Sequence, residues 1–188
     1  MTDPFAQLAA GHGLVDRSGT SPDELPERYL YSPDMRYRYA FGRWWGGDDL
    51  ASTVVWVLLN PATGDTEKRR RPTLDRCIGR SREMGATGLL IVNLFAFRHT
   101  DPAMIRSAED PVGPAGDDAL RVLTGAGMAT VAAWGSHGSW RGRSSEVGPL
   151  LSDPMCLGTT AGGEPRHPLY VRGDAPLVPW RPPGSGVG

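Results

Sequence analysis

The sequence predicts an α/β fold, because short apolar runs that suit buried strands alternate along the chain with segments of helical periodicity. The 188 residues have room for one domain of ordinary size with terminal extensions. The 25 glycines and 17 prolines exceed average usage, which favours many tight turns and few long helices. We therefore expect a three-layer αβα architecture, with helices on both faces of a central, mainly parallel sheet.

Five segments have the character of strands. Residues 52–60 (STVVWVLLN) form a nearly continuous β-branched and apolar run, as expected for a strand buried on both faces. Residues 88–93 (GLLIVN) and 129–134 (ATVAAW) share this character and should run parallel to the first, and residues 155–158 are a weaker candidate. Residues 37–45 (YRYAFGRWW) alternate large and small side chains, which predicts a strand at an edge of the sheet.

Three segments between the strands have helical periodicity. Residues 72–84 begin at a proline, stop before Gly85 and gather apolar side chains on one face. Residues 116–123 carry two aspartates in their first turn, where carboxylates suit the helix dipole. Residues 139–151 place Trp140 and Val147 at helical spacing.

Composition divides the chain into three zones. Residues 1–35 are rich in Pro, Gly, Asp and Ser, which predicts a loosely packed arm. Residues 36–180 form the single α/β domain, and residues 181–188 a disordered Pro/Gly tail. We expect the first 20 residues and this tail to be the least ordered parts of the chain.

Charge and composition narrow the class of protein. The net charge is −1, so no broad positive field attracts duplex DNA. No apolar run approaches 18 residues and the first residues lack a signal-peptide layout, so we expect a cytoplasmic protein without membrane contact. Two cysteines are too few for a disulfide framework, and Cys77 fits core packing better than reactivity.

Several standard chemistries lack their motifs. Neither GxGxxG nor GxxxxGK[ST] is present, which disfavours dinucleotide and P-loop phosphate binding. HExxH and CxxC are missing and the four histidines have no ligand spacing, so we expect no metal and no cofactor. Ser136 follows Trp-Gly rather than the Gly-x of a nucleophile elbow, which disfavours a serine nucleophile.

Each predicted strand is followed by residues that packing alone would not select. The carboxyl ends of parallel strands meet at one edge of a sheet, where α/β proteins bind ligands. The clusters that would converge there are Asn60-Pro61, Asn93 to Arg98, Trp134-Gly135, and Arg166-His167-Pro168. This convergence predicts a functional site.

Each cluster also has a structural interpretation. Asn60-Pro61 is a common turn pair, and Asn93 could cap the segment that follows it. His167 could be a structural histidine, and Trp134 suits the core because its ring buries a large area. The basic run 68–71 (KRRR) is either a solvated loop or, since it precedes a helix N-terminus, a grip for phosphate.

The order of short motifs resembles that of the DUF1643 family over about residues 36–180. The matching motifs are Tyr37-Arg38-Tyr39, Leu58-Leu59-Asn60-Pro61, Pro72-Thr73-Leu74, Asn93-Leu94-Phe95-Ala96, Asp110-Pro111-Val112-Gly113, Ala133-Trp134-Gly135 and Arg166-His167-Pro168-Leu169-Tyr170. Members usually carry acidic residues just before Pro-Thr-Leu, whereas this chain has three arginines at 69–71. A role for that acidic pair is therefore not carried over to this chain.

The same order is similar, more distantly, to the uracil-DNA glycosylase superfamily. This resemblance implies a glycosylase-like αβα fold in which Asn60 positions the hydrolytic water and Asn93 reads the base. Trp134-Gly135 matches the end of the third strand. His167, before a proline, would stabilise the leaving base.

The chemistry of the remaining candidates agrees with that resemblance. Pro61 and Trp134 would border the substrate, and Phe95 (or Phe97) would offer the base a stacking face. Arg98 and Arg166 would bind phosphate as rigid forks.

We therefore expect an N-glycosidase-like hydrolase acting on a nucleotide, a nucleoside or single-stranded nucleic acid. The alternative is a non-catalytic protein that binds a nucleotide or a modified base. A third interpretation is a metabolic enzyme that acts on another class of substrate on the same scaffold.

Overall fold

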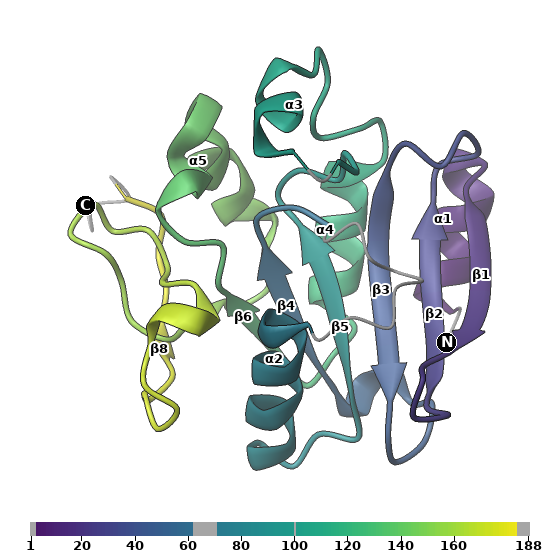
Figure 1. Ribbon diagram of the computed structural model, residues 1–188, viewed down its shortest axis with the longest axis horizontal. Helices are drawn as coiled ribbons and strands as arrows, with labels where there is room; N and C mark the ends of the chain where they lie inside the picture. The colour runs from purple at the N-terminus through teal and green to yellow at the C-terminus, as the bar shows by residue number, and fades with distance from the viewer. Residues whose placement is uncertain (1–2, 62–70, 100, 184–188) are drawn as a thin grey trace.

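The computed structural model describes residues 3–61, 71–99 and 101–183. Eight strands form one sheet in the order β1-β2-β3-β5-β4-β6-β7-β8 (Figure 1). The strands are β1 (Val15–Thr20), β2 (Pro26–Tyr31), β3 (Arg38–Trp44), β4 (Thr53–Leu58), β5 (Gly88–Asn93), β6 (Ala129–Ala132), β7 (Met155–Cys156) and β8 (Val178–Pro179). The α/β fold class is confirmed.

The centre of the sheet is parallel and its flanks are antiparallel. The three strands that were expected to run parallel, β4, β5 and β6, do so, and β7 pairs parallel to β6. The pairs β1–β2, β2–β3, β3–β5 and β7–β8 are antiparallel, so the sheet is mixed, and the prediction of a mainly parallel sheet is wrong. The β1–β2 and β2–β3 pairs are antiparallel because the short connections between these strands allow no parallel pairing.

Helices lie on both faces of the sheet and seal two apolar clusters. On the face that we call the α2 face, α2 (Pro72–Glu83) packs Leu74 and Cys77 against β4 and β5. On the opposite face, the α4 face, α1 (Pro4–His12), α4 (Gly116–Thr124) and α5 (Arg143–Val147) cover the sheet. Side chains alternate along each strand, so β5 gives Leu89 and Ile91 to the α2 face and Leu90 and Val92 to the α4 face.

Two of the three predicted helices form as expected, and the third is broken. α2 begins at Pro72, and Gly85, with φ +80°, ends its last turn. Residues 136–150 form η2 (Ser136–Gly142), α5 and η3 (Gly148–Leu150) rather than one helix. Arg141 and Gly142 both take positive φ, which interrupts the helical path. The remaining elements are α3 (Pro102–Ser107), η1 (Leu50–Ser52) and η4 (Pro168–Tyr170).

The N-terminal residues belong to the core, so the prediction of a loosely packed arm is wrong. Asp3 caps α1 by accepting a hydrogen bond from Phe5 N–H, and Phe5 and Leu8 are fully buried in the α4-face cluster. Strands β1 and β2 then extend the sheet. The polar composition led to this wrong prediction because two apolar residues, Phe5 and Leu8, are enough to anchor the short helix α1 in the core.

Two further expectations concern single segments. Residues 37–45 do form a strand, β3, but it lies inside the sheet between β2 and β5 and not at an edge. Of the predicted tail, residues 184–188 lie outside the described residues. No helix in the described ranges combines the length and apolar character that crossing a membrane requires.

Candidate functional site

The carboxyl ends of β4, β5 and β6 meet at one edge of the sheet, as expected of parallel neighbours. Leu58, the last residue of β4, lies beside Asn93, the last residue of β5. The chain leaves β4 for β5 on one side and returns to β6 on the other, which makes the end of β4 a topological switch point. Ligands of open α/β sheets bind at such a point.

Asn60 and Pro61 form the loop that leaves this switch point. Pro61 is buried, and Asn60 is half-buried with its Nδ2 donating to the Pro61 carbonyl oxygen at 3.3 Å. Phe95 N–H donates to the Leu59 carbonyl oxygen at 3.0 Å, which ties this loop to the one that follows β5. The structure therefore brings Asn60 and Asn93 to the same corner of the sheet.

The Asn93 side chain is buried and unsatisfied. The residue is 3% exposed, and neither Oδ1 nor Nδ2 has a hydrogen-bond partner in the part of the chain that the structure describes. By the alternation along β5, this amide lies on the α2 face with Leu89 and Ile91. Leaving a buried amide unsatisfied costs about 1–3 kcal/mol per group, so a native protein keeps one for a reason.

The first turn of α2 packs on the same face of the sheet as the Asn93 amide. Leu74 packs in one apolar cluster with Leu58 and Ile91. Arg71 is the N-cap residue, and its side chain makes no capping hydrogen bond. The helix N-terminus, where backbone N–H groups lack intrahelical acceptors, therefore faces the edge of the sheet that holds Asn93.

Two arginines occupy the α2 face at this edge, and only one was predicted. Arg98 donates through Nη1 to the Met35 carbonyl oxygen at 2.8 Å, and its Cζ lies 4.9 Å from the centre of the Tyr31 ring. Arg38, the register partner of Tyr31, is 4% exposed, and its Cζ lies 5.6 Å from the centre of the Phe41 ring. Sequence reasoning missed Arg38 because it opens a strand that was expected at the sheet edge.

His167 approaches the site from the C-terminal part of the chain. Gly135 N–H donates to the Pro165 carbonyl oxygen at 2.9 Å, and a Cβ at Gly135 would lie 3.3 Å from that of His167, so the histidine sits beside the end of β6. His167 caps η4, and η4 packs against α2. This packing puts the segment on the same face as the Asn93 amide.

The tautomer and charge of His167 follow from its surroundings. Its Nδ1 accepts a hydrogen bond from Leu169 N–H at 3.3 Å, so the proton of the neutral ring resides on Nε2. Burial lowers the pKa of the imidazole below its ordinary value. At neutral pH the ring is therefore an uncharged hydrogen-bond donor.

Phe95 and Trp134 do not join this group. Both belong to the α4-face cluster and are 2% exposed, and the ring centre of Phe95 lies 4.9 Å from that of Trp140. Trp134 Nε1 donates to the buried Glu164 Oε2 at 2.7 Å, and Ser144 Oγ donates to Glu164 Oε1 at 2.7 Å. Both rings are therefore enclosed by packing contacts on the α4 face, in agreement with the packing interpretation of Trp134.

Two other predicted features lie apart from the buried residues. Arg166 is exposed and donates through Nε to the Thr159 carbonyl oxygen at 2.9 Å. Of the basic run at 68–71, residues 68–70 lie outside the described residues. No group of three or more His, Cys, Asp or Glu side chains within the described ranges could hold a metal ion.

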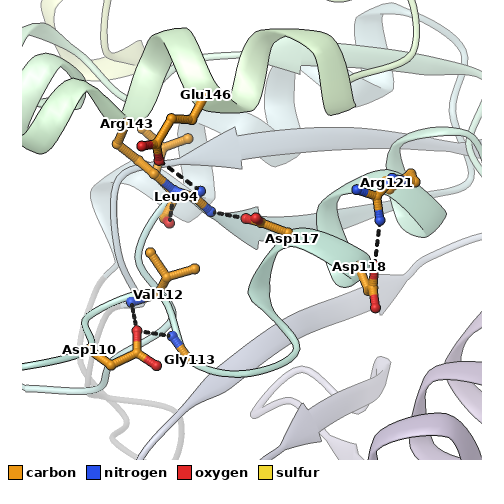
Figure 2. Close-up of polar contacts among 9 residues, drawn as sticks. All are labelled: Leu94, Asp110, Val112, Gly113, Asp117, Asp118, Arg121, Arg143 and Glu146. Atoms are coloured by element: carbon orange, nitrogen blue, oxygen red, sulfur yellow. Dashed lines mark hydrogen bonds and ion pairs between the residues drawn. The ribbon is translucent and has the colours of Figure 1, made fainter.

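A buried arginine on the α4 face fixes the loop that follows Asn93. Arg143 is 3% exposed and donates through Nε to the Leu94 carbonyl oxygen at 3.0 Å (Figure 2). Its Nη2 donates to Asp117 Oδ1 at 2.6 Å, and its Nη1 lies 3.5 Å from Glu146 Oε2. Arg143 was not predicted, because nothing in the sequence distinguishes it from a surface arginine of an exposed helix.

The Asp110-Pro111-Val112-Gly113 motif forms a turn that supports β3. Asp110 Oδ1 accepts hydrogen bonds from the N–H groups of Val112 at 3.0 Å and of Gly113 at 2.9 Å (Figure 2). Gly113 has φ +81°, and a Cβ there would lie 2.6 Å from the Tyr37 ring, so only glycine fits. The motif is therefore structural.

Comparison with known proteins agrees with the motif order. No curated protein and no solved structure matches the chain. The family described as "Protein of unknown function (DUF1643)" matches residues 38–169. That range runs from the start of β3 into η4 and includes Asn60, Asn93 and His167. Because the match covers well over half of its length, the chain belongs to the DUF1643 family.

Proposed function

We propose that the protein is an N-glycosidase-like hydrolase that acts on a nucleobase-containing substrate at the carboxyl edge of β4 and β5. The observation that carries this proposal is the buried Asn93 amide, which lacks a hydrogen-bond partner among the described residues. An amide offers one acceptor beside two donors, and the edge of a nucleobase offers complementary groups. Binding a base would satisfy both polar atoms that folding leaves unsatisfied.

Asn60 would position the water. Its loop begins two residues after Leu58, the strand neighbour of Asn93, so a base held by Asn93 would present its sugar near Asn60. A neutral amide cannot take a proton from water, but it can hold the oxygen in line with the sugar carbon. The water oxygen bonds to that carbon as the carbon–nitrogen bond breaks, and the bonding pair leaves with the base.

His167 would stabilise the departing base. The base carries negative charge in the transition state, and a neutral Nε2–H can donate a hydrogen bond to it. Once the bond is broken, the water gives up a proton and the base takes one, so the reaction consumes one water and releases a free base and a free sugar hydroxyl. These roles agree with the resemblance to the uracil-DNA glycosylase superfamily.

The remaining candidates contribute to binding in this proposal. Pro61 would border the base, and Arg98 and Arg166 would attract a phosphate group. Phe95 and Trp134, which are enclosed in the α4-face cluster, have no role in it. The substrate is a small nucleobase compound or a single strand rather than duplex DNA, since the net charge is −1.

The test is release of free base from a panel of nucleosides, nucleotides and single-stranded oligonucleotides. Asn60→Ala should slow release roughly 100-fold while leaving affinity largely intact, because Asn60 acts mainly in the transition state. Asn93→Ala should weaken binding about tenfold or more. Arg121→Gln, an exposed change on α4, is the matched control and should alter neither quantity.

A non-catalytic nucleotide-binding or modified-base-binding protein is the second candidate. It is favoured by the chemistry of Asn60 and His167, neither of which is a ready general base for water in its described surroundings. Tight binding of one panel member without release of its base would establish this candidate. Base release that depends on Asn60 would exclude it.

A further inference from the structure

The N-terminus of α2 has N–H donors with no acceptor in the described part of the chain. Pro72 has no N–H, and the N–H groups of Thr73 and Leu74 have no acceptor among residues 3–61, 71–99 and 101–183. The first hydrogen bond of the helix is that from Asp75 N–H to the Arg71 carbonyl oxygen at 2.9 Å. The aligned peptide dipoles give such an end about half a positive charge.

This helix end points toward the edge of the sheet at which β4 and β5 end (Figure 1). Trp56 Nε1 donates to Ser81 Oγ at 2.9 Å, which aligns the last turns of α2 with the middle of β4. The eight residues from Ser81 back to Thr73 rise about 12 Å toward that edge. Leu74, in the first turn of α2, belongs to the same apolar cluster as Leu58.

The Asn93 amide supplies a second sign of a ligand on the same face of the sheet. Asn93 is the register partner of Leu58, lies on the α2 face, and is buried with both polar atoms unsatisfied in the described chain. The two polar atoms of Asn93 can bind a ligand edge that offers one donor and one acceptor, whereas the helix N-terminus favours an anion. A ligand that satisfies both carries a base and a phosphate.

We infer that the N-terminus of α2 binds the phosphate of a nucleoside monophosphate whose base is read by Asn93. The inference rests on the proposed function and narrows its substrate class from nucleobase compounds to free mononucleotides. Thr73 and Leu74 contribute backbone N–H groups to the phosphate, as helix N-termini do in other phosphate sites. No covalent step is added to the reaction.

The arginines further along α2 favour a mononucleotide over a strand. Arg80 donates to the carbonyl oxygens of Gly173 at 2.6 Å and Ala175 at 2.5 Å, and it pairs with Glu83 at 3.0 Å. The Cζ of Arg82 lies 5.1 Å from the centre of the Trp45 ring. Both side chains are thus engaged within the protein rather than free to hold a second and third phosphate.

Calorimetric titration tests the inference with the nucleosides and the 5′-monophosphates of adenine, guanine, cytosine, uracil and thymine. One monophosphate should bind at least about tenfold more tightly than its nucleoside. Thr73→Glu places a carboxylate at the helix end, so it should abolish this advantage and leave nucleoside binding unchanged. Its melting temperature should not fall, because an acidic residue in the first turn suits the helix dipole.

Gly79→Glu is the matched control. It adds the same charge on the exposed side of α2, where a Cβ meets no atom within 4 Å, and about 9 Å along the helix from Thr73. It should keep the phosphate advantage. Equal affinity for nucleoside and monophosphate, a phosphate advantage that survives Thr73→Glu, or no binding by any of the ten compounds would overturn the inference.

Turnover separates this inference from the proposed function. Base release from unphosphorylated nucleosides at the rate of the monophosphates would leave the glycosidase standing and remove the phosphate site. Phosphate-dependent binding that Thr73→Glu abolishes, without base release from any compound, would remove the glycosidase and leave the phosphate site standing.

Discussion

Two buried polar side chains lie near the end of β5, on opposite faces of the sheet. They differ in whether other groups of the protein form hydrogen bonds with them. On the α4 face, Arg143 donates to the Leu94 carbonyl oxygen and pairs with Asp117 and Glu146 (Figure 2). On the α2 face, one residue earlier in the chain, the Asn93 amide has no partner in the described structure. Both residues are 3% exposed, so burial alone does not separate them.

The difference distinguishes a structural group from one kept for a ligand. The hydrogen bonds of Arg143 offset the cost of burying a guanidinium and hold the backbone beside Asn93. No hydrogen bond within the described chain offsets the cost of burying the Asn93 amide. An apolar side chain of the same size would be buried there at a lower cost in free energy. Replacing Arg143 by an apolar residue should therefore lower the free energy of unfolding, whereas replacing Asn93 by an apolar residue should raise it.

The largest loss is expected from Arg143→Met. This change removes three contacts and leaves the Leu94 carbonyl oxygen without its donor, so the free energy of unfolding should fall by about 3 kcal/mol in urea denaturation. Arg121→Met is the matched control, because Arg121 pairs with Asp118 but its side chain is 55% exposed. The control should cost less than about 0.5 kcal/mol, and an equal loss in both variants would contradict a structural role specific to Arg143.

A smaller loss is expected from Trp134→Phe. Phenylalanine keeps most of the apolar contact with Trp180 but leaves Glu164 Oε2 without the indole donor. We expect a loss of about 2 kcal/mol in the free energy of unfolding, measured in the same way. Binding of a nucleobase compound by the folded variant should be unchanged. Lost binding at unchanged stability would place Trp134 in the ligand site after all.

Periodicity and burial patterns made most of the central fold predictable. β4, β5 and β6 read as continuous apolar runs because both of their faces are covered, and α2 is bounded by Pro72 and Gly85. β1 was missed because it is exposed along its whole length and therefore carries no apolar signal. Only pairing with its neighbour makes it a strand, and pairing is not visible in local sequence.

The site residues that directly follow a strand could be predicted from the sequence. The residues whose position depends on tertiary contacts could not. Asn93 and Asn60 follow apolar strands directly, so their edge of the sheet could be inferred. The face of the sheet on which the rings of Phe95 and Trp134 lie could not be inferred, because the chain turns after each strand ends. Arg38 and Arg143 were missed because burial of an arginine depends on partners distant in the sequence.

A still smaller effect is expected from pH at His167. Burial lowers the pKa of this imidazole in the folded protein, so the unfolded chain binds the proton more readily. The resulting contribution to stability is complete above the unfolded pKa of about 6.5 and is lost as the pH falls through the folded value. Thermal unfolding between pH 7.5 and 5 should show this decline, and His167→Gln should reduce it. An equal decline in wild type and His167→Gln would contradict the role of burial.

The most direct test of the comparison is the free energy of unfolding of Asn93→Leu, measured without ligand beside Val92→Thr. Leucine matches the shape of asparagine without its polar atoms, so the account predicts no loss and a gain of about 1 kcal/mol. Val92→Thr adds an unsatisfied hydroxyl to the fully buried neighbour on the α4 face and should cost about 1–2 kcal/mol, which calibrates the assay. A loss of 1 kcal/mol or more in Asn93→Leu would show that the amide stabilises the fold, and would contradict its reservation for a ligand.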